Sequence, residues 1–121
     1  MATHKELIVW QKGIQLVKEV YQLTQSFPKE EVFGLTSQIR RCAVSIPSNI
    51  AEGCARRSDK ELIQFLHIAL GSAAELETQL IISKELSYLT DESFNTISSL
   101  NNEIIRLLSA LLNRIKNKSN S

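Results

Sequence analysis

Apolar residues recur every three or four positions in four long segments of the chain, and short polar stretches separate these segments. This spacing indicates amphipathic α-helices, because one face of a helix repeats about every 3.6 residues. The predicted helices span about residues 6–26, 36–56, 59–86 and 91–116. Long helices with short connections favour an all-α fold, an antiparallel up-down-up-down four-helix bundle that forms a single domain over residues 1–121.

Local signals place the ends of these helices. Phe27 precedes Pro28 and ends the first helix, because the residue before a proline avoids the α region. Ser58 and Glu61 form a capping box that begins the third helix. In the first helix we expect a single apolar stripe to face the core, made of Leu7, Trp10, Ile14, Val17 and Val20 or Tyr21.

The second and third helices carry more apolar surface than one core requires. Beside each core stripe lies an additional stripe, formed by Val44, Pro47 and Ala51 in the second helix and by Ile63, Leu70, Ala74 and Ile81 in the third. Surplus apolar surface usually marks a protein interface, so these residues are predicted to join copies of the chain. Two different stripes also satisfy the heterologous contact that a ring requires.

Two residues inside these helices call for compensating contacts. Pro47 removes a backbone hydrogen bond, which costs about 3 kcal/mol in a helix interior. Gly71 costs about 1 kcal/mol relative to alanine. We therefore expect a neighbouring backbone to approach the third helix closely around Gly71.

The formal net charge of +1 is small, but the charges are segregated along the chain. Residues 36–60 are basic, residues 61–105 are acidic, and the residues from 106 onward carry only cations. The candidate phosphate-binding residues are Arg40, Arg41, Arg56, Arg57 and Lys60. Arginine binds phosphate bidentately, which favours nucleic acid as a ligand. Ordinary solvated or salt-bridged arginines are the alternative, and the absence of interleaved aromatic residues predicts weak sequence specificity.

No set of residues predicts catalysis, a metal site or a cofactor. His4 and His67 have no Cys, Asp or Glu three or four residues further on that would build a metal site. Cys42 and Cys54 lie about 18 Å apart on one helix, too far for a disulfide, and are expected to be small core residues. Glu77 is expected either to pair with Arg40 or Arg41 or to be solvated. Without a signal peptide or membrane-spanning run, we expect a cytoplasmic protein that does not enter the membrane.

Residues from about Leu7 to Leu89 resemble the bacterial four-helix-bundle proteins linked to 23S rRNA intervening sequences. The resemblance rests on the segments VWQK, SFP, GLTSQIRR, VSIPSNIAEG and ALGSAAELETQL. It extends to the accessory proteins of diversity-generating retroelements. It implies a homo-oligomer in the form of a five-membered ring, no enzymatic activity, and nucleic-acid binding through basic residues, in some members beside a reverse transcriptase.

These observations predict a cytoplasmic, non-enzymatic ring of four-helix bundles, a pentamer by resemblance, that binds nucleic acid through the five cations named above. Structured RNA is the expected ligand, and binding should weaken steeply with salt. The alternative is a protein-interaction scaffold that binds no nucleic acid. Its arginines would form salt bridges between subunits, with Glu77 or Glu52 as partners.

Overall fold

The computed structural model describes residues 3–119 and contains four long α-helices and two short 3₁₀ helices. The helices are η1 (His4–Glu6), α1 (Ile8–Thr24), η2 (Lys29–Glu31), α2 (Leu35–Cys54), α3 (Asp59–Glu85) and α4 (Asp91–Ser119). Each long helix begins and ends within three residues of the predicted range. No β-strand occurs in this part of the chain.

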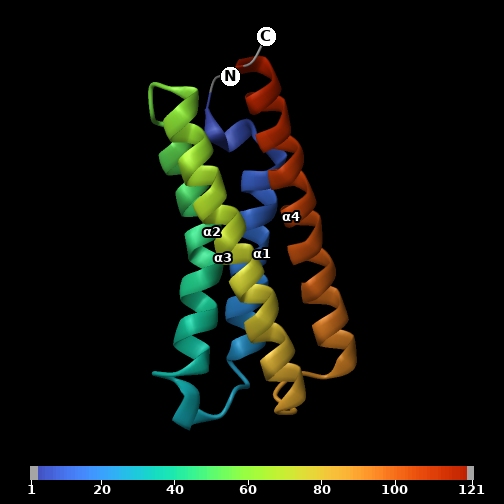
Figure 1. Cartoon of the computed structure of the whole chain (residues 1–121). Helices are drawn as coiled ribbons and strands as arrows, with labels where there is room; N and C mark the ends of the chain where they lie inside the picture. The colour runs from blue at the N-terminus through green and yellow to red at the C-terminus, as the bar shows by residue number, and fades with distance from the viewer. Residues whose placement is uncertain (1–2, 120–121) are drawn as a thin grey trace.

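Successive helices run in opposite directions along one axis (Figure 1). Helix α1 packs against α2 and α4, and α3 packs against the same two helices, so the four form a closed bundle. The predicted antiparallel four-helix bundle is therefore confirmed. The two chain ends and the α2–α3 connection lie at one end of the bundle, whereas η2 and the α3–α4 connection lie at the other (Figure 1).

Side chains satisfy backbone groups where the helices begin. The Ser58 hydroxyl accepts a hydrogen bond from Glu61 N at 3.2 Å, as the capping box predicts. The Thr90 hydroxyl accepts from Ser93 N at 3.0 Å at the start of α4. Glu31 accepts from Leu35 N at 3.2 Å and from the Tyr88 hydroxyl at 2.9 Å, so η2 is tied both to α2 and to the α3–α4 connection.

The predicted core stripe of α1 is confirmed in part. Val20 is buried and Leu7, Trp10 and Val17 pack against the core, but the buried face is rotated toward Val9 and Leu16. Ile14 is 46% exposed and Trp10 is only half-buried. Two apolar stripes overlap on this helix, and periodicity alone does not choose between them. Gly13 is buried on the inward face, where the absence of a side chain lets α2 approach closely, and this favours the observed rotation of α1.

That close approach joins Gly13 to Pro47. A Cβ atom added to Gly13 would lie 3.3 Å from Pro47 Cβ, so the proline ring packs directly on the α1 backbone. Pro47 is buried and α2 continues through it without a break. Nearby, Asn49 Nδ2 donates to Ser45 O at 2.8 Å, and the Ser45 hydroxyl lies 2.9 Å from that of Ser72 on α3. These contacts on two neighbouring helices offset the backbone hydrogen bond that the proline removes.

The expected close contact at Gly71 is absent within the protomer. Gly71 is exposed, and a Cβ atom added there would meet nothing within 4 Å. The small residues around it serve a different contact, because the carbonyl of Ala73 accepts a hydrogen bond from Nδ2 of the buried Asn101 on α4 at 2.9 Å. The close packing of α2 on α3 lies instead at Gly53. A Cβ atom there would lie 2.9 Å from Phe65 Cβ and 3.0 Å from Leu62 Cδ1.

These two glycines give a matched pair of substitutions. Gly53→Ala should lower the free energy of unfolding by about 1–3 kcal/mol, because the added methyl group has no room between α2 and α3. Gly71→Ala should raise it by about 0.5–1 kcal/mol, because alanine favours the helix and meets no neighbour there. Urea unfolding followed by circular dichroism measures both values. A Gly53→Ala protein as stable as the wild type would contradict the close packing of α2 on α3.

Candidate nucleic-acid interface

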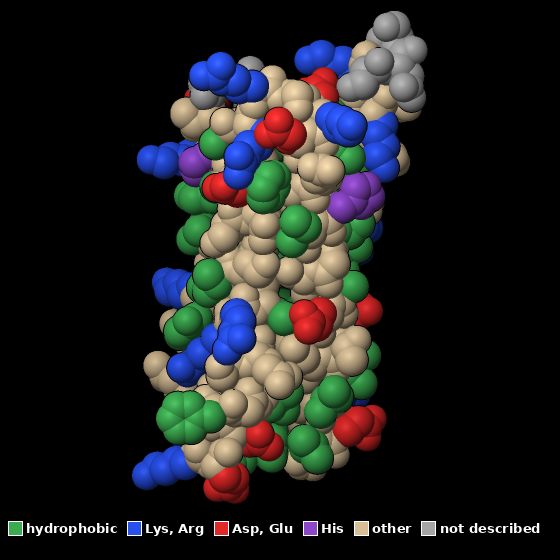
Figure 2. All heavy atoms as spheres, turned by 60° about the vertical axis from the view of Figure 1, so that its left-hand side comes forward, with side chains coloured by type: hydrophobic (Ala, Val, Ile, Leu, Met, Phe, Trp, Pro, Cys, Tyr) green, Lys and Arg blue, Asp and Glu red, His purple; other side chains and the backbone are tan. Residues whose placement is uncertain are grey.

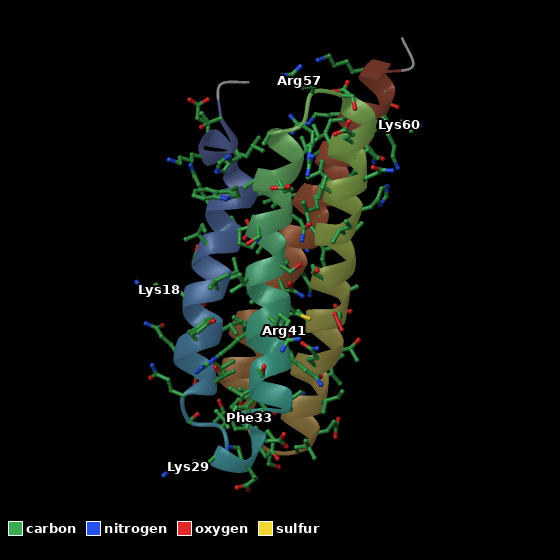
Figure 3. All side chains as sticks on the ribbon, turned by 90° about the vertical axis from the view of Figure 1, so that its left-hand side faces the viewer. Lys18, Lys29, Phe33, Arg41, Arg57 and Lys60 are labelled. Carbon is green, nitrogen blue, oxygen red and sulfur yellow. The ribbon has the colours of Figure 1, made fainter. Side chains whose placement is uncertain are left out.

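The five predicted cations lie in two separate regions of the bundle. Figure 3 shows Arg41 in the half that ends at η2, and Arg57 and Lys60 at the opposite end. The separation is on the order of 20 Å along the bundle axis, at about 1.5 Å of rise per helical residue. The five residues therefore do not form a single patch.

Cations of α4, which are distant in sequence, lie close to the α2–α3 connection in space. Because α4 runs antiparallel to α3, its last turns come to the end of the bundle where α3 begins. Lys116 Nζ lies 3.1 Å from His67 Nε2, which fixes this juxtaposition. We call this region the basic end, and it comprises Arg56, Arg57, Lys60, Arg114, Lys116 and Lys118. Figure 2 shows more Lys and Arg side chains at this end than at the opposite end, with acidic side chains at both.

The cations of the basic end differ in whether they already form contacts within the protein. Arg56 forms a 2.6 Å ion pair with Glu52 and lies 4.9 Å over the ring of Phe65, so it supports the end of α2. Arg57 and Lys60 are exposed and take part in none of the ion pairs found among residues 3–119. Carboxylates of Glu6, Asp59 and Glu61 share this end, but cations outnumber them.

Arg114, Lys116 and Lys118 were not among the predicted site residues. The signal in the sequence was the run of cations without acidic residues after position 106. Its relevance emerges only when the bundle order is known, because α4 lies far from the α2–α3 connection in sequence and beside it in space.

Arg40 and Arg41 belong to a groove between α1 and α2. This α1–α2 groove has a volume of about 610 Å³, and its lining includes Tyr21, Thr36, Ser37, Arg40, Arg41 and Val44. Arg40 Nε donates to the Thr24 hydroxyl at 2.9 Å, and its guanidinium carbon lies 4.5 Å from the centroid of the Tyr21 ring. Arg41 is exposed and donates to the Ser37 hydroxyl at 3.3 Å.

The expected ion pair between Glu77 and an arginine does not form within the protomer. Glu77 is exposed, and the partners of Arg40 and Arg41 are the hydroxyl groups and the aromatic ring described above. The solvated alternative for Glu77 is the one that the structure supports.

Some residues of the additional apolar stripes are buried within the protomer. Pro47 is buried against α1, and the small part of it that remains accessible lines a shallow groove together with Val44 and Ala51. Ala51 is half-buried, and Ile63 and Leu70 pack against the core. Three members of the stripes remain exposed to solvent, namely Val44 at 39%, Ile81 at 45%, and Ala74.

The two cysteines are held as thiols. Cys42 is buried and its Sγ donates to Glu75 Oε2 at 3.0 Å. Burial, followed by this hydrogen bond, raises the pKa of Cys42 to about 11. Burial also raises the pKa of Cys54. Within residues 3–119, no group of three or more His, Cys, Asp or Glu side chains is placed to hold a metal ion.

Among the described helices, none is both long enough and apolar enough to cross a membrane.

Comparison with known proteins gives a consistent result. Residues 5–110 match the family model described as 23S rRNA-intervening sequence protein. A crystal structure of a protein of unknown function from the S23 ribosomal protein family of Bacteroides thetaiotaomicron superimposes with a TM-score of 0.81 and is 28% identical. The alignment covers 87% of this chain and 98% of that one. No curated protein matches this chain.

The raised pKa of Cys42 predicts low thiol reactivity. At pH 8 the folded protein of a Cys54→Ser variant should react with a disulfide reagent roughly 100-fold more slowly than the unfolded chain, because a pKa of about 11 leaves far less thiolate. Stopped-flow absorbance measures the rate. The folded state binds this proton more tightly than the unfolded state, so its stabilising contribution is complete below pH 9 and declines as the pH rises toward 11. Rapid labelling of the native protein would contradict the burial of Cys42.

Proposed function

Because the chain belongs to the 23S rRNA-intervening sequence protein family, we propose that it is a non-enzymatic, cytoplasmic homo-oligomer that binds structured RNA. The observation that carries this proposal is the basic end, where cations of the α2–α3 connection and of α4 gather on one exposed surface. Grouped cations release counterions from a nucleic-acid backbone, and this release supplies most of the affinity when no bases are read.

The proposed contacts are made by the exposed cations of the basic end. Arg57, Lys60 and Arg114 project into solvent and can reach phosphate oxygens without breaking a contact that holds the bundle together. Arg56 contributes less, because Glu52 already neutralises it. Such contacts position a protein on a phosphate backbone and carry little sequence information.

Assembly would multiply this weak surface. In a ring, a pentamer by resemblance to the family, each subunit presents its basic end on the same side, so one RNA can engage several copies at once. The proposed contact surface between copies is the outer face of α3, where Ile81, Ile82 and Leu86 are 45%, 43% and 50% exposed beside each other along the chain. Ala74 extends this face toward the middle of the helix.

A protein-interaction scaffold is the second candidate, and one observation favours it. Phe33 is 95% exposed at the η2 end, far from the basic end (Figure 3). An aromatic side chain in water is a typical anchor for a protein partner. In this case the partner, a reverse transcriptase or another protein, would bind at the η2 end while RNA binds at the opposite one.

Charge reversal at the basic end tests RNA binding. The double variant Arg57→Glu/Lys60→Glu should bind a structured RNA hairpin at least about tenfold more weakly than the wild type, because each lost phosphate contact also removes a released counterion. Fluorescence anisotropy at several salt concentrations gives the affinity and the salt slope, which should become less steep. Arg106→Glu, at an exposed position midway along α4, makes one such charge reversal, and its matched comparison is the single variant Arg57→Glu, which changes the charge by the same amount. Equal losses in these two single variants, or a wild-type affinity that does not depend on salt, would refute a phosphate contact at the basic end.

Substitution on α3 tests the assembly. Wild-type protein should elute as a multiple of the 13.6 kDa protomer in size-exclusion chromatography with light scattering. Ile81→Glu/Ile82→Glu should shift it toward a single protomer, because burying two carboxylates at an apolar contact is costly. Ile8→Glu, at a position 61% exposed on α1, should leave the mass unchanged. A wild-type protein that elutes as a monomer would end the ring proposal.

A further inference from the structure

The α1–α2 groove combines features that the sequence keeps apart. Its lining contains an aromatic ring, two arginines and several hydroxyl groups, and it contains no carboxylate. We propose that this groove binds an unpaired nucleotide of RNA, with the base stacked at Arg40 and the phosphate at Arg41. This inference rests on the proposed RNA-binding function and names the part of the RNA that a second site would take.

The stacking surface is already assembled. The Arg40 guanidinium lies over the Tyr21 ring at 4.5 Å, and its Nε donates to the Thr24 hydroxyl at 2.9 Å. Thr24 is buried and its own hydroxyl donates to Val20 O at 2.8 Å, so the acceptor of Arg40 is fixed in place. RNA-binding proteins stack unpaired bases on aromatic rings and on guanidinium planes. A base resting on Arg40 would complete a stack of three layers with Tyr21 beneath.

An unpaired polar group lies in the wall of the same groove. Thr36 is only 5% exposed, and its hydroxyl has no hydrogen-bond partner among the described residues. Its side chain lines both the α1–α2 groove and an adjoining cavity of about 500 Å³. A buried hydroxyl without a partner destabilises the protein. Because this hydroxyl has almost no solvent-accessible surface, a base in the groove pairs with it only after the Thr36 side chain rotates toward the groove.

The charges around the groove match a phosphate. Arg41 is exposed and is only loosely tied to Ser37 at 3.3 Å. Lys18 and Lys29 lie on the same face of the bundle, toward the η2 end (Figure 3). The groove volume of about 610 Å³ lies within the range of roughly 300–1,000 Å³ typical of small-ligand sites.

A nucleotide suits this groove better than a second copy of the chain. A protein surface that covered Arg40 and Arg41 would remove two guanidinium groups from water, so a second copy fits only if it places a carboxylate such as that of the exposed Glu77 against them, because the groove itself provides none. A nucleotide brings its own anionic group and its own planar ring. The groove therefore favours a ligand that is aromatic and negatively charged at once.

The test compares an RNA hairpin that carries an unpaired loop with a blunt duplex of the same stem. Fluorescence anisotropy should show that wild-type protein prefers the looped RNA. Tyr21→Ala and Arg40→Lys should weaken loop binding by roughly 5- to 150-fold, the range for losing one base stack, and leave duplex binding unchanged. Arg40→Lys keeps the charge and removes the planar surface, together with the hydrogen bond from Arg40 Nε to the Thr24 hydroxyl. Tyr21→Phe keeps the ring and should retain the preference for the loop.

Each outcome separates this inference from the proposed function. Tyr21 is 41% exposed, so its substitution should leave the bundle folded, and circular dichroism checks this. If the wild-type protein bound neither RNA, the proposed RNA-binding function would be contradicted. Equal affinity for both RNAs, unaffected by Tyr21→Ala, would overturn the groove inference and leave the basic end intact. A lower oligomer mass for Tyr21→Ala in light scattering would also overturn it, because the groove would then be a contact between copies.

Discussion

The contact between Gly13 and Pro47 determines how α1 is rotated in the bundle, and most of the surface follows from that rotation. The proline ring packs most closely against the α1 backbone where no side chain intervenes, so the contact favours Gly13 facing α2. With Gly13 inward, Leu16 and Val20 enter the core and Tyr21 is carried to the edge of α2. Tyr21 then lies against the Arg40 guanidinium, and these two side chains form one wall of the α1–α2 groove.

The same contact explains how the bundle tolerates a proline in the middle of α2. A lost backbone hydrogen bond costs about 3 kcal/mol in an isolated helix, but here the proline ring gains close packing on α1. Close to the proline, the hydrogen bond between the Ser45 and Ser72 hydroxyl groups ties α2 to α3. Helix α2 is therefore held from two directions, which accounts for much of its additional apolar stripe without a second protein chain.

The antiparallel order distributes charge between the two ends of the molecule. It brings the cations of α4 beside the α2–α3 connection, whereas Glu30, Glu31, Glu85, Asp91 and Glu92 lie around the η2 end. A net charge of +1 thus conceals a surface with one strongly basic end. In the proposed function this end attracts the phosphate backbone, and the α1–α2 groove takes an unpaired base that the backbone presents.

The sequence by itself determined the four helices and the capping box at Ser58, because local periodicity and end signals report on these features. It also identified five cations of the candidate site. Only the tertiary structure decided which stripe of α1 faces inward, since two apolar stripes on one helix are equivalent until a neighbour packs on it. It likewise decided that Arg40 stacks on Tyr21 and that Lys116 lies beside His67, because these partners are brought together by helix packing across many residues of sequence.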